Sequence, residues 1–119
     1  MNELESRTQQ FAIDVRLFLR SLNIDFFIRE DVNQLIKSSG SVGANYIEAN
    51  ECLSKKDFLY RIKICLKEAK ESRYWLQILK NTNKEITKPK IDYLINESTQ
   101  LVRIFSSIVK KLKAAKNGK

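Results

Sequence analysis

Histidine is absent from the 119-residue chain, and its absence restricts the chemistry that the protein can perform. Without histidine the chain lacks the commonest general base and the commonest zinc ligand. A Ser-His-Asp triad is impossible, and Cys65 has no histidine partner that could generate a thiolate. We therefore expect a protein that is not an enzyme and that holds no metal or other cofactor.

Glycine and proline are scarce, with three copies and one copy, and this scarcity favours helices over a sheet protein that needs more turn residues. The two cysteines, Cys52 and Cys65, are too few for a disulfide scaffold, so we expect them to act as small hydrophobic residues. No apolar run approaches the roughly 18–20 residues that span a membrane. The first residues also lack the basic and then apolar layout of a signal peptide. These features predict a cytoplasmic protein with no membrane partner.

Positive charge is concentrated in the second half of the chain. Residues 1–60 contain 7 Lys and Arg against 9 Asp and Glu, whereas residues 61–119 contain 15 against 5. A basic half attracts polyanions, above all nucleic acid, although a solvated lysine-rich surface that only aids solubility remains an alternative. The residues predicted to bind nucleic acid are Arg61, Lys63, Lys67, Lys70, Arg103, Lys110, Lys111 and Lys113. No sequence-reading motif accompanies them, so binding would depend on charge and shape.

Apolar residues recur at steps of three and four in four segments, which predict helices over about 4–26, 31–51, 55–81 and 88–115. Because the connections are short, consecutive helices should be antiparallel neighbours. The sequence therefore predicts an all-α, up-down-up-down four-helix bundle that forms one domain over residues 1–119. In the first connection, Phe26, Phe27 and Ile28 are expected to cover an end of the bundle. Residues 116–119 are expected to fray.

The segment 38–45 resembles a loop by propensity, because it contains Gly40, Gly43 and several serines. The apolar steps continue through it, so we predict a continuous helix whose small residues let another backbone approach closely. Asn45 and Glu48 lie on one face beside the inner stripe. Polar residues in this position usually fix helix register, but a functional contact is also possible.

The third predicted helix has a second face beside its core stripe, formed by Ile64, Glu68, Glu71 and Trp75. A large aromatic residue on such a face often anchors a protein–protein interface, so these four residues are the predicted oligomer interface. Packing of Trp75 against the first connection is the alternative. The carboxylates of Glu68 and Glu71 are expected to pair with neighbouring lysines rather than to bind metal.

Two stretches resemble a known family. QLIKSSGSVGANYIEA at 34–49 is similar to the signature of the four helix bundle protein family. This family is also called the 23S rRNA intervening sequence protein family and was once labelled ribosomal protein S23. SKKDFL at 54–59 and KEAKESRYWL at 67–76 are similar to the family's third helix. The resemblance covers roughly residues 8–113, and one departure is Ala49, where the family often has glycine.

The resemblance implies a bacterial, non-catalytic bundle that assembles as a homopentamer. A relative in diversity-generating retroelements binds nucleic acid, which agrees with a role for this chain in binding RNA or DNA. An alternative is a structural protein–protein interaction module that binds no nucleic acid. The resemblance also implies a structural role for the signature residues Ser39, Ser41, Gly43, Asn45 and Glu48.

Overall fold

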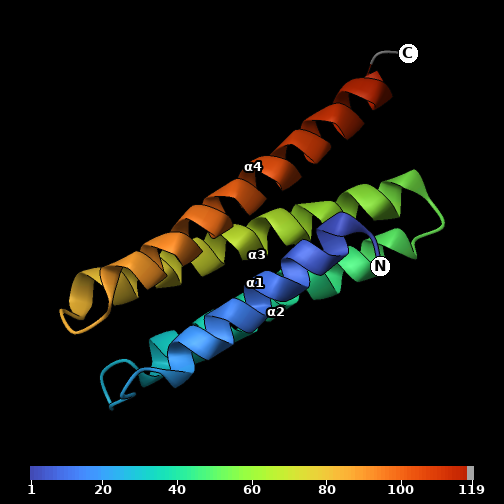
Figure 1. The fold of residues 1–119 in the computed structure, drawn as a ribbon. Coiled ribbons are helices and arrows are strands. Elements are labelled where there is room, and N and C mark those ends of the chain that lie inside the picture. The colour runs from blue at the N-terminus through green and yellow to red at the C-terminus, as the bar shows by residue number, and fades with distance from the viewer. Residues whose placement is uncertain (118–119) are drawn as a thin grey trace.

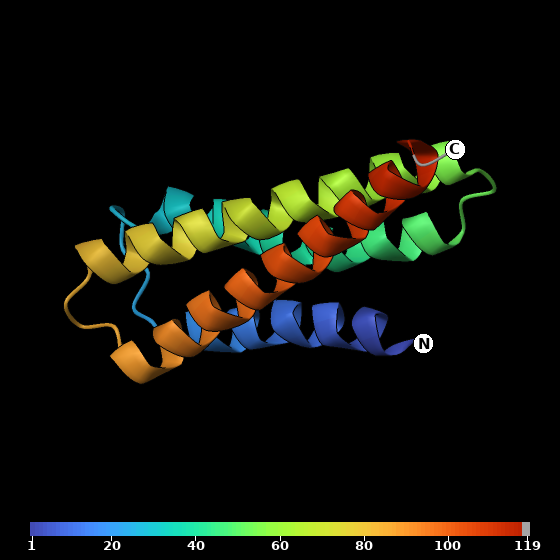
Figure 2. The ribbon, with the colours of Figure 1, turned by 90° about the horizontal axis from the view of Figure 1, so that it is seen from above.

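The computed structural model describes residues 1–117, and within this range the chain forms four helices. They are α1 (Glu3–Arg20), α2 (Arg29–Asn50), α3 (Lys55–Thr82) and α4 (Lys88–Asn117). Consecutive helices run antiparallel around one hydrophobic core (Figures 1 and 2). The all-α, antiparallel four-helix bundle predicted from the sequence is therefore confirmed. Residues 118 and 119, which belong to the tail predicted to fray, lie outside the described range.

The first helix is shorter than predicted, because α1 ends at Arg20 and not near residue 26. The Ser21 hydroxyl donates a 2.6 Å hydrogen bond to the carbonyl oxygen of Phe18, which caps the last turn. Asp25 then accepts a hydrogen bond from the backbone N–H of Ile28 at 3.2 Å and closes the connection. Short polar side chains compete with the helix for backbone hydrogen bonds, and here they end it.

The same connection corrects a second prediction. Phe26 and Phe27 do not cover the end of the bundle, since their side chains are 83% and 88% exposed. Ile28, the third residue of that prediction, is buried in the core as expected. The turn closed by Asp25 directs Ile28 inward and leaves the two phenylalanines at the tip.

Helix α2 is continuous through residues 38–45, as predicted. The hydroxyls of Ser38 and Ser39 donate to carbonyl oxygens one turn earlier, at 3.3 and 3.2 Å, so these polar side chains are satisfied inside the bundle. Gly43 lies against α1, where an added Cβ would be 2.9 Å from Oγ1 of Thr8. The small residues of α2 therefore allow the close approach of another backbone.

The helices differ in length, and this leaves the bundle uneven. Helix α1 has 18 residues and α4 has 30, and the two are joined by an ion pair between Arg7 and Glu97 at 2.8 Å. Toward its C-terminal end α4 leaves α1 and remains against α3 (Figures 1 and 2). There the rings of Tyr46 and Phe105 meet with centroids 5.8 Å apart and close the core. No helix among the described residues is long and apolar enough to cross a membrane.

Candidate nucleic-acid interface

One ion pair sets the register between α3 and α4. Nζ of Lys80 lies 2.6 Å from Oδ1 of Asp92, so these two residues occupy the flanks along which the helices meet. Residues seven apart lie in one column of a bundle helix. The antiparallel pairing therefore continues from Lys80 and Asp92 to Arg73 and Thr99.

Lysines and arginines line both helices just outside this seam. On α3 the exposed Lys63 and Lys70 are one heptad apart, next to the column of Arg73. On α4 the exposed Arg103 and Lys110 are also one heptad apart, next to the column that contains Lys113. We define the basic face as these six residues: Lys63, Lys70, Arg73, Arg103, Lys110 and Lys113.

Acidic side chains are kept away from the basic face. Asp57, Glu68 and Glu71 of α3 lie in columns on the side of α2, and residues 98–115 of α4 contain no acid at all. The two acids of α4 are both used in ion pairs, Asp92 with Lys80 and Glu97 with Arg7. No residue of the basic face forms an ion pair with a described acid. The face is therefore uniformly positive along the two helices.

Three of the predicted nucleic-acid-binding residues lie elsewhere. Arg61 faces α2, where its guanidinium donates to Oδ1 of Asn45 at 3.0 Å and pairs with Glu48 at 2.8 Å. Lys67 lies at the outer edge of α3, with its Nζ 3.9 Å from Glu71 of the same helix. Lys111 is two heptads after Glu97 and therefore faces the α1 flank of α4.

Lys56 belongs beside the basic face, although it was not among the residues predicted from the sequence to bind nucleic acid. Lys56 is exposed in the first turn of α3, one heptad before Lys63, and it extends the same positive column. The signal was available in the sequence, because Lys56, Lys63 and Lys70 are spaced by seven residues.

Asn45 and Glu48, the polar pair of the family signature, hold α2 and α3 together. The side-chain N–H of Asn45 donates to the carbonyl of Ser41 at 2.8 Å, which leaves its oxygen free to accept from Arg61. Glu48 then binds the same guanidinium. These contacts favour the interpretation that the pair fixes helix register.

A second site lies on α3 beside α2, and we call it the α3 stripe: Ile64, Glu68, Glu71 and Trp75. All four side chains are half-buried. Burial raises the pKa of the Glu68 carboxyl, and the charge of Glu71 raises it further. The rings of Tyr74 and Trp75 meet edge to face with centroids 5.0 Å apart. The stripe thus combines apolar area with two acids, and Lys67 is the base beside both of them.

The core contains polar and nucleophilic groups, but they are arranged for packing. The Ser72 hydroxyl donates to that of Ser38 at 3.0 Å, which links α2 and α3 inside the bundle. Burial raises the pKa of the Cys65 thiol to about 12, so it remains protonated at neutral pH. Among the described residues, no three potential metal-ligating side chains cluster together.

Comparisons with known proteins support the resemblance seen in the sequence. The profile of the family described as 23S rRNA-intervening sequence protein matches residues 5–107. A similar crystal structure is that of a protein with unknown function from the S23 ribosomal protein family of Bacteroides thetaiotaomicron. It shares 32% identity and a TM-score of 0.74, and the match covers 89% of this chain and 97% of that chain. A search of curated proteins found no match. The chain therefore belongs to the 23S rRNA-intervening sequence protein family.

Proposed function

We propose that the protein is a non-catalytic, self-associating bundle that binds the phosphate backbone of RNA or DNA through the basic face. The observation that carries this proposal is the uniformly positive surface along α3 and α4, where no described acid forms an ion pair with a residue of the basic face. Lysines and arginines that neutralise phosphates release counterions, and this release drives binding without reading bases. The family name, which refers to 23S rRNA, supports RNA as the ligand to test first.

The absence of histidine and the protonated thiol of Cys65 support a non-catalytic role. The basic face presents exposed lysines, and the hydroxyl of its neighbour Ser106 can donate a hydrogen bond to a phosphate oxygen. No exposed aromatic side chain lies between Arg103, Lys110 and Lys113, so the α4 part of the basic face offers no ring on which bases could stack. Binding should therefore be sensitive to salt and tolerant of sequence.

The test is binding of a structured RNA hairpin, measured by fluorescence anisotropy over a series of salt concentrations. The variant K63E/K70E/K110E reverses three charges of the basic face. The control R29E/K37E/K84E reverses three exposed charges on α2 and the α3–α4 connection, so both variants change net charge equally. We expect wild type and control to bind with a steep salt dependence, about 0.7–0.9 in log–log slope per phosphate contacted.

The variant K63E/K70E/K110E should lose most of this affinity and most of the salt dependence. No binding by wild type at about 50 mM salt, a shallow slope, or equal losses in both variants would contradict the proposal.

A second function, a structural interaction module, is favoured by the half-buried apolar side chains of Ile64 and Trp75 on the α3 stripe. In that case the protein would form an oligomer that does not bind RNA at any salt concentration. Light scattering together with the anisotropy series separates the two functions, because only the first requires binding of the hairpin.

A further inference from the structure

The side of α3 that faces away from the core carries tyrosines as well as lysines. Five of its residues follow one another at steps of three and four, so they form one row along the helix. All five side chains are exposed, whereas the buried residues of α3 lie on the opposite side. We call this the outer row, and it consists of Tyr60, Lys63, Lys67, Lys70 and Tyr74.

The two tyrosines stand at the ends of the outer row. Their side chains are 62% and 56% exposed, so neither ring is used to build the core. They are two heptads apart, or about 21 Å along the helix axis. The ring of Tyr74 meets that of Trp75 edge to face with centroids 5.0 Å apart, and this contact still leaves more than half of the Tyr74 side chain open to solvent.

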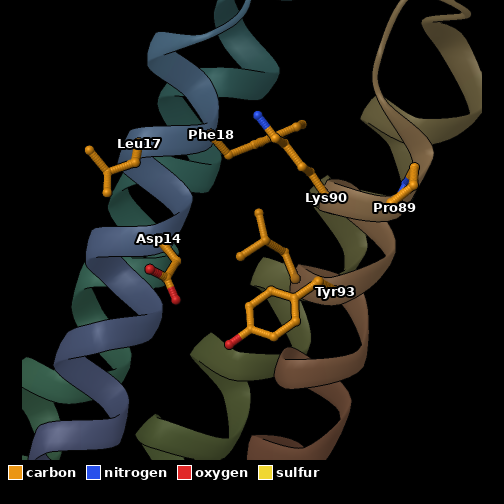
Figure 3. A pocket seen from close by; sticks show the side chains of 7 residues that line it. Asp14, Leu17, Phe18, Pro89, Lys90 and Tyr93 are labelled. Atoms are coloured by element: carbon orange, nitrogen blue, oxygen red, sulfur yellow. The ribbon is translucent and has the colours of Figure 1, made fainter.

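The charge beside these tyrosines differs from the charge beside Tyr93, the other exposed tyrosine. Figure 3 shows Tyr93 and Asp14 pointing toward each other across the groove between α1 and α4, so a carboxylate lies opposite that ring. In the outer row, Tyr60 is one helical turn from Lys63, and Tyr74 is one turn from Lys70. A phosphate would be repelled by Asp14 but attracted beside the rings of the outer row.

Exposed rings among lysines suit a nucleic acid whose bases are unpaired. Lysines attract the phosphates of any strand, paired or not. An aromatic ring adds affinity only where a base can leave its neighbours and stack on the ring, and this is open to a single strand but not to the interior of a duplex. With phosphates about 3.4 Å apart along a stacked strand, the distance between the two tyrosines corresponds to about six nucleotides.

We propose that the outer row binds a single-stranded segment of nucleic acid. The lysines neutralise its phosphates, and the rings of Tyr60 and Tyr74 each stack on one unpaired base. This inference rests on the proposed function and names the class of nucleic acid that is preferred. The outer row shares Lys63 and Lys70 with the basic face, so the two surfaces form one continuous site. Because every base has a flat ring, the preference is for an unpaired strand and not for a sequence.

Three variants that leave the net charge unchanged separate stacking from attraction to phosphates. Y60A/Y74A removes both rings of the outer row. Y60F/Y74F keeps the rings and removes only the hydroxyls. Tyr93→Ala is the matched control, because it removes a tyrosine that is equally exposed but lies beside Asp14. Circular dichroism verifies that each variant remains helical.

Each protein is titrated by fluorescence anisotropy with three RNA ligands. The first is an unstructured strand of about 12 nucleotides, roughly twice the number that spans the outer row. The second is a strand of the same length whose sugars carry no bases, so that only the phosphates remain. The third is a duplex of the same length. Affinities of the variants are compared with wild type on the same ligand.

Y60A/Y74A should bind the unstructured strand at least about fivefold more weakly than wild type, the loss expected when one base no longer stacks. Its salt dependence should equal that of wild type, because the lysines are unchanged. Y60F/Y74F and Y93A should bind this strand as wild type does. On the strand without bases and on the duplex, all four proteins should have the same affinity.

Several outcomes would overturn this inference alone. They are an unchanged affinity of Y60A/Y74A for the unstructured strand, an equal loss of affinity for the duplex, and a loss in Y60F/Y74F as large as in Y60A/Y74A. Equal affinity of wild type for the strands with and without bases would also overturn it. In each case attraction to phosphates would remain. A wild type that binds none of the three ligands instead contradicts the proposed function on which the inference rests.

Discussion

Thr8 and Gly43 set the distance between α1 and α2. The hydroxyl of Thr8 is buried and donates to the carbonyl oxygens of Leu4 and Glu5 at 2.9 and 3.0 Å, so it is fixed in place. A Cβ at position 43 would lie 2.9 Å from this hydroxyl oxygen and 3.2 Å from its Cβ. Neither atom belongs to the far end of a flexible side chain. The small residue in α2 is thus required by the neighbouring helix.

Gly43→Ala should therefore lower the free energy of unfolding by about 1–3 kcal/mol, because the added methyl group overpacks the contact. Gly40→Ala is the control on the same helix. Its Cβ would meet only the tip of Arg16, which can move, and alanine favours the helix by up to about 1 kcal/mol. Urea unfolding followed by circular dichroism measures both variants. Equal effects at the two positions would contradict this account.

Cys65 provides a prediction about pH. Burial raises the pKa of its thiol from 9.0 to about 12 in the folded protein. The unfolded thiol ionises around its ordinary value, so this contribution to stability is complete below pH 9 and is lost as the pH rises toward 12. Urea unfolding at about pH 8 and about pH 10 should show a smaller decline for Cys65→Ala than for wild type. An identical decline in both proteins would argue against a buried, protonated thiol.

At the scale of elements, α2 and α3 are tied by Arg61, which binds Asn45 and Glu48 together. Removing the guanidinium deprives two acceptors of their donor, so Arg61→Ala should lower the free energy of unfolding by about 0.5–1.5 kcal/mol. Lys67→Ala, which removes a 3.9 Å contact within α3, should change it by less than about 0.5 kcal/mol. A double-mutant cycle with Glu48→Ala measures the coupling, and additive effects would show that the ion pair contributes nothing.

The elements also show how much the sequence could predict. The recurrence of apolar residues at steps of three and four predicted all four helices. It also correctly predicted that α2 continues through its serines and glycines, because the burial of one helix face outweighs local helix propensity. The same steps extended α1 too far, since the side-chain hydrogen bonds of Ser21 and Asp25 end it. Apolar character also predicted burial of Phe26 and Phe27, whereas the geometry of the turn leaves them outside.

The candidate site was predictable in composition but not in arrangement. Net charge indicated which half of the chain is basic, and Lys63 and Lys70 are among the residues predicted from it. The sequence did not indicate that Arg61 is held by α2, because that contact depends on the register between two helices.

The whole molecule is an elongated bundle of 53 × 23 × 23 Å whose flanks carry different surfaces. The basic face lies along the outer side of α3 and α4. The α3 stripe lies on the side of α3 that faces α2. An oligomer whose copies meet through this stripe would leave the basic face of every copy open, so several basic faces could bind one long RNA.

This separation predicts that Trp75→Glu, which places a charge in the predicted oligomer interface, affects binding of long and short RNA differently. On a hairpin that fits one basic face, W75E should match wild type in affinity and in salt dependence, because the face is intact. On an RNA long enough to reach several copies, wild type should bind about 10²–10⁴-fold more tightly than the variant, since linked sites raise the effective concentration. Anisotropy titrations with the two RNAs measure the ratio, with Leu53→Glu as control because Leu53 is fully exposed away from the α3 stripe. Equal losses on both RNAs would mean that Trp75 itself supports the nucleic-acid surface, and equal affinities on the long RNA would mean that the copies do not bind it together.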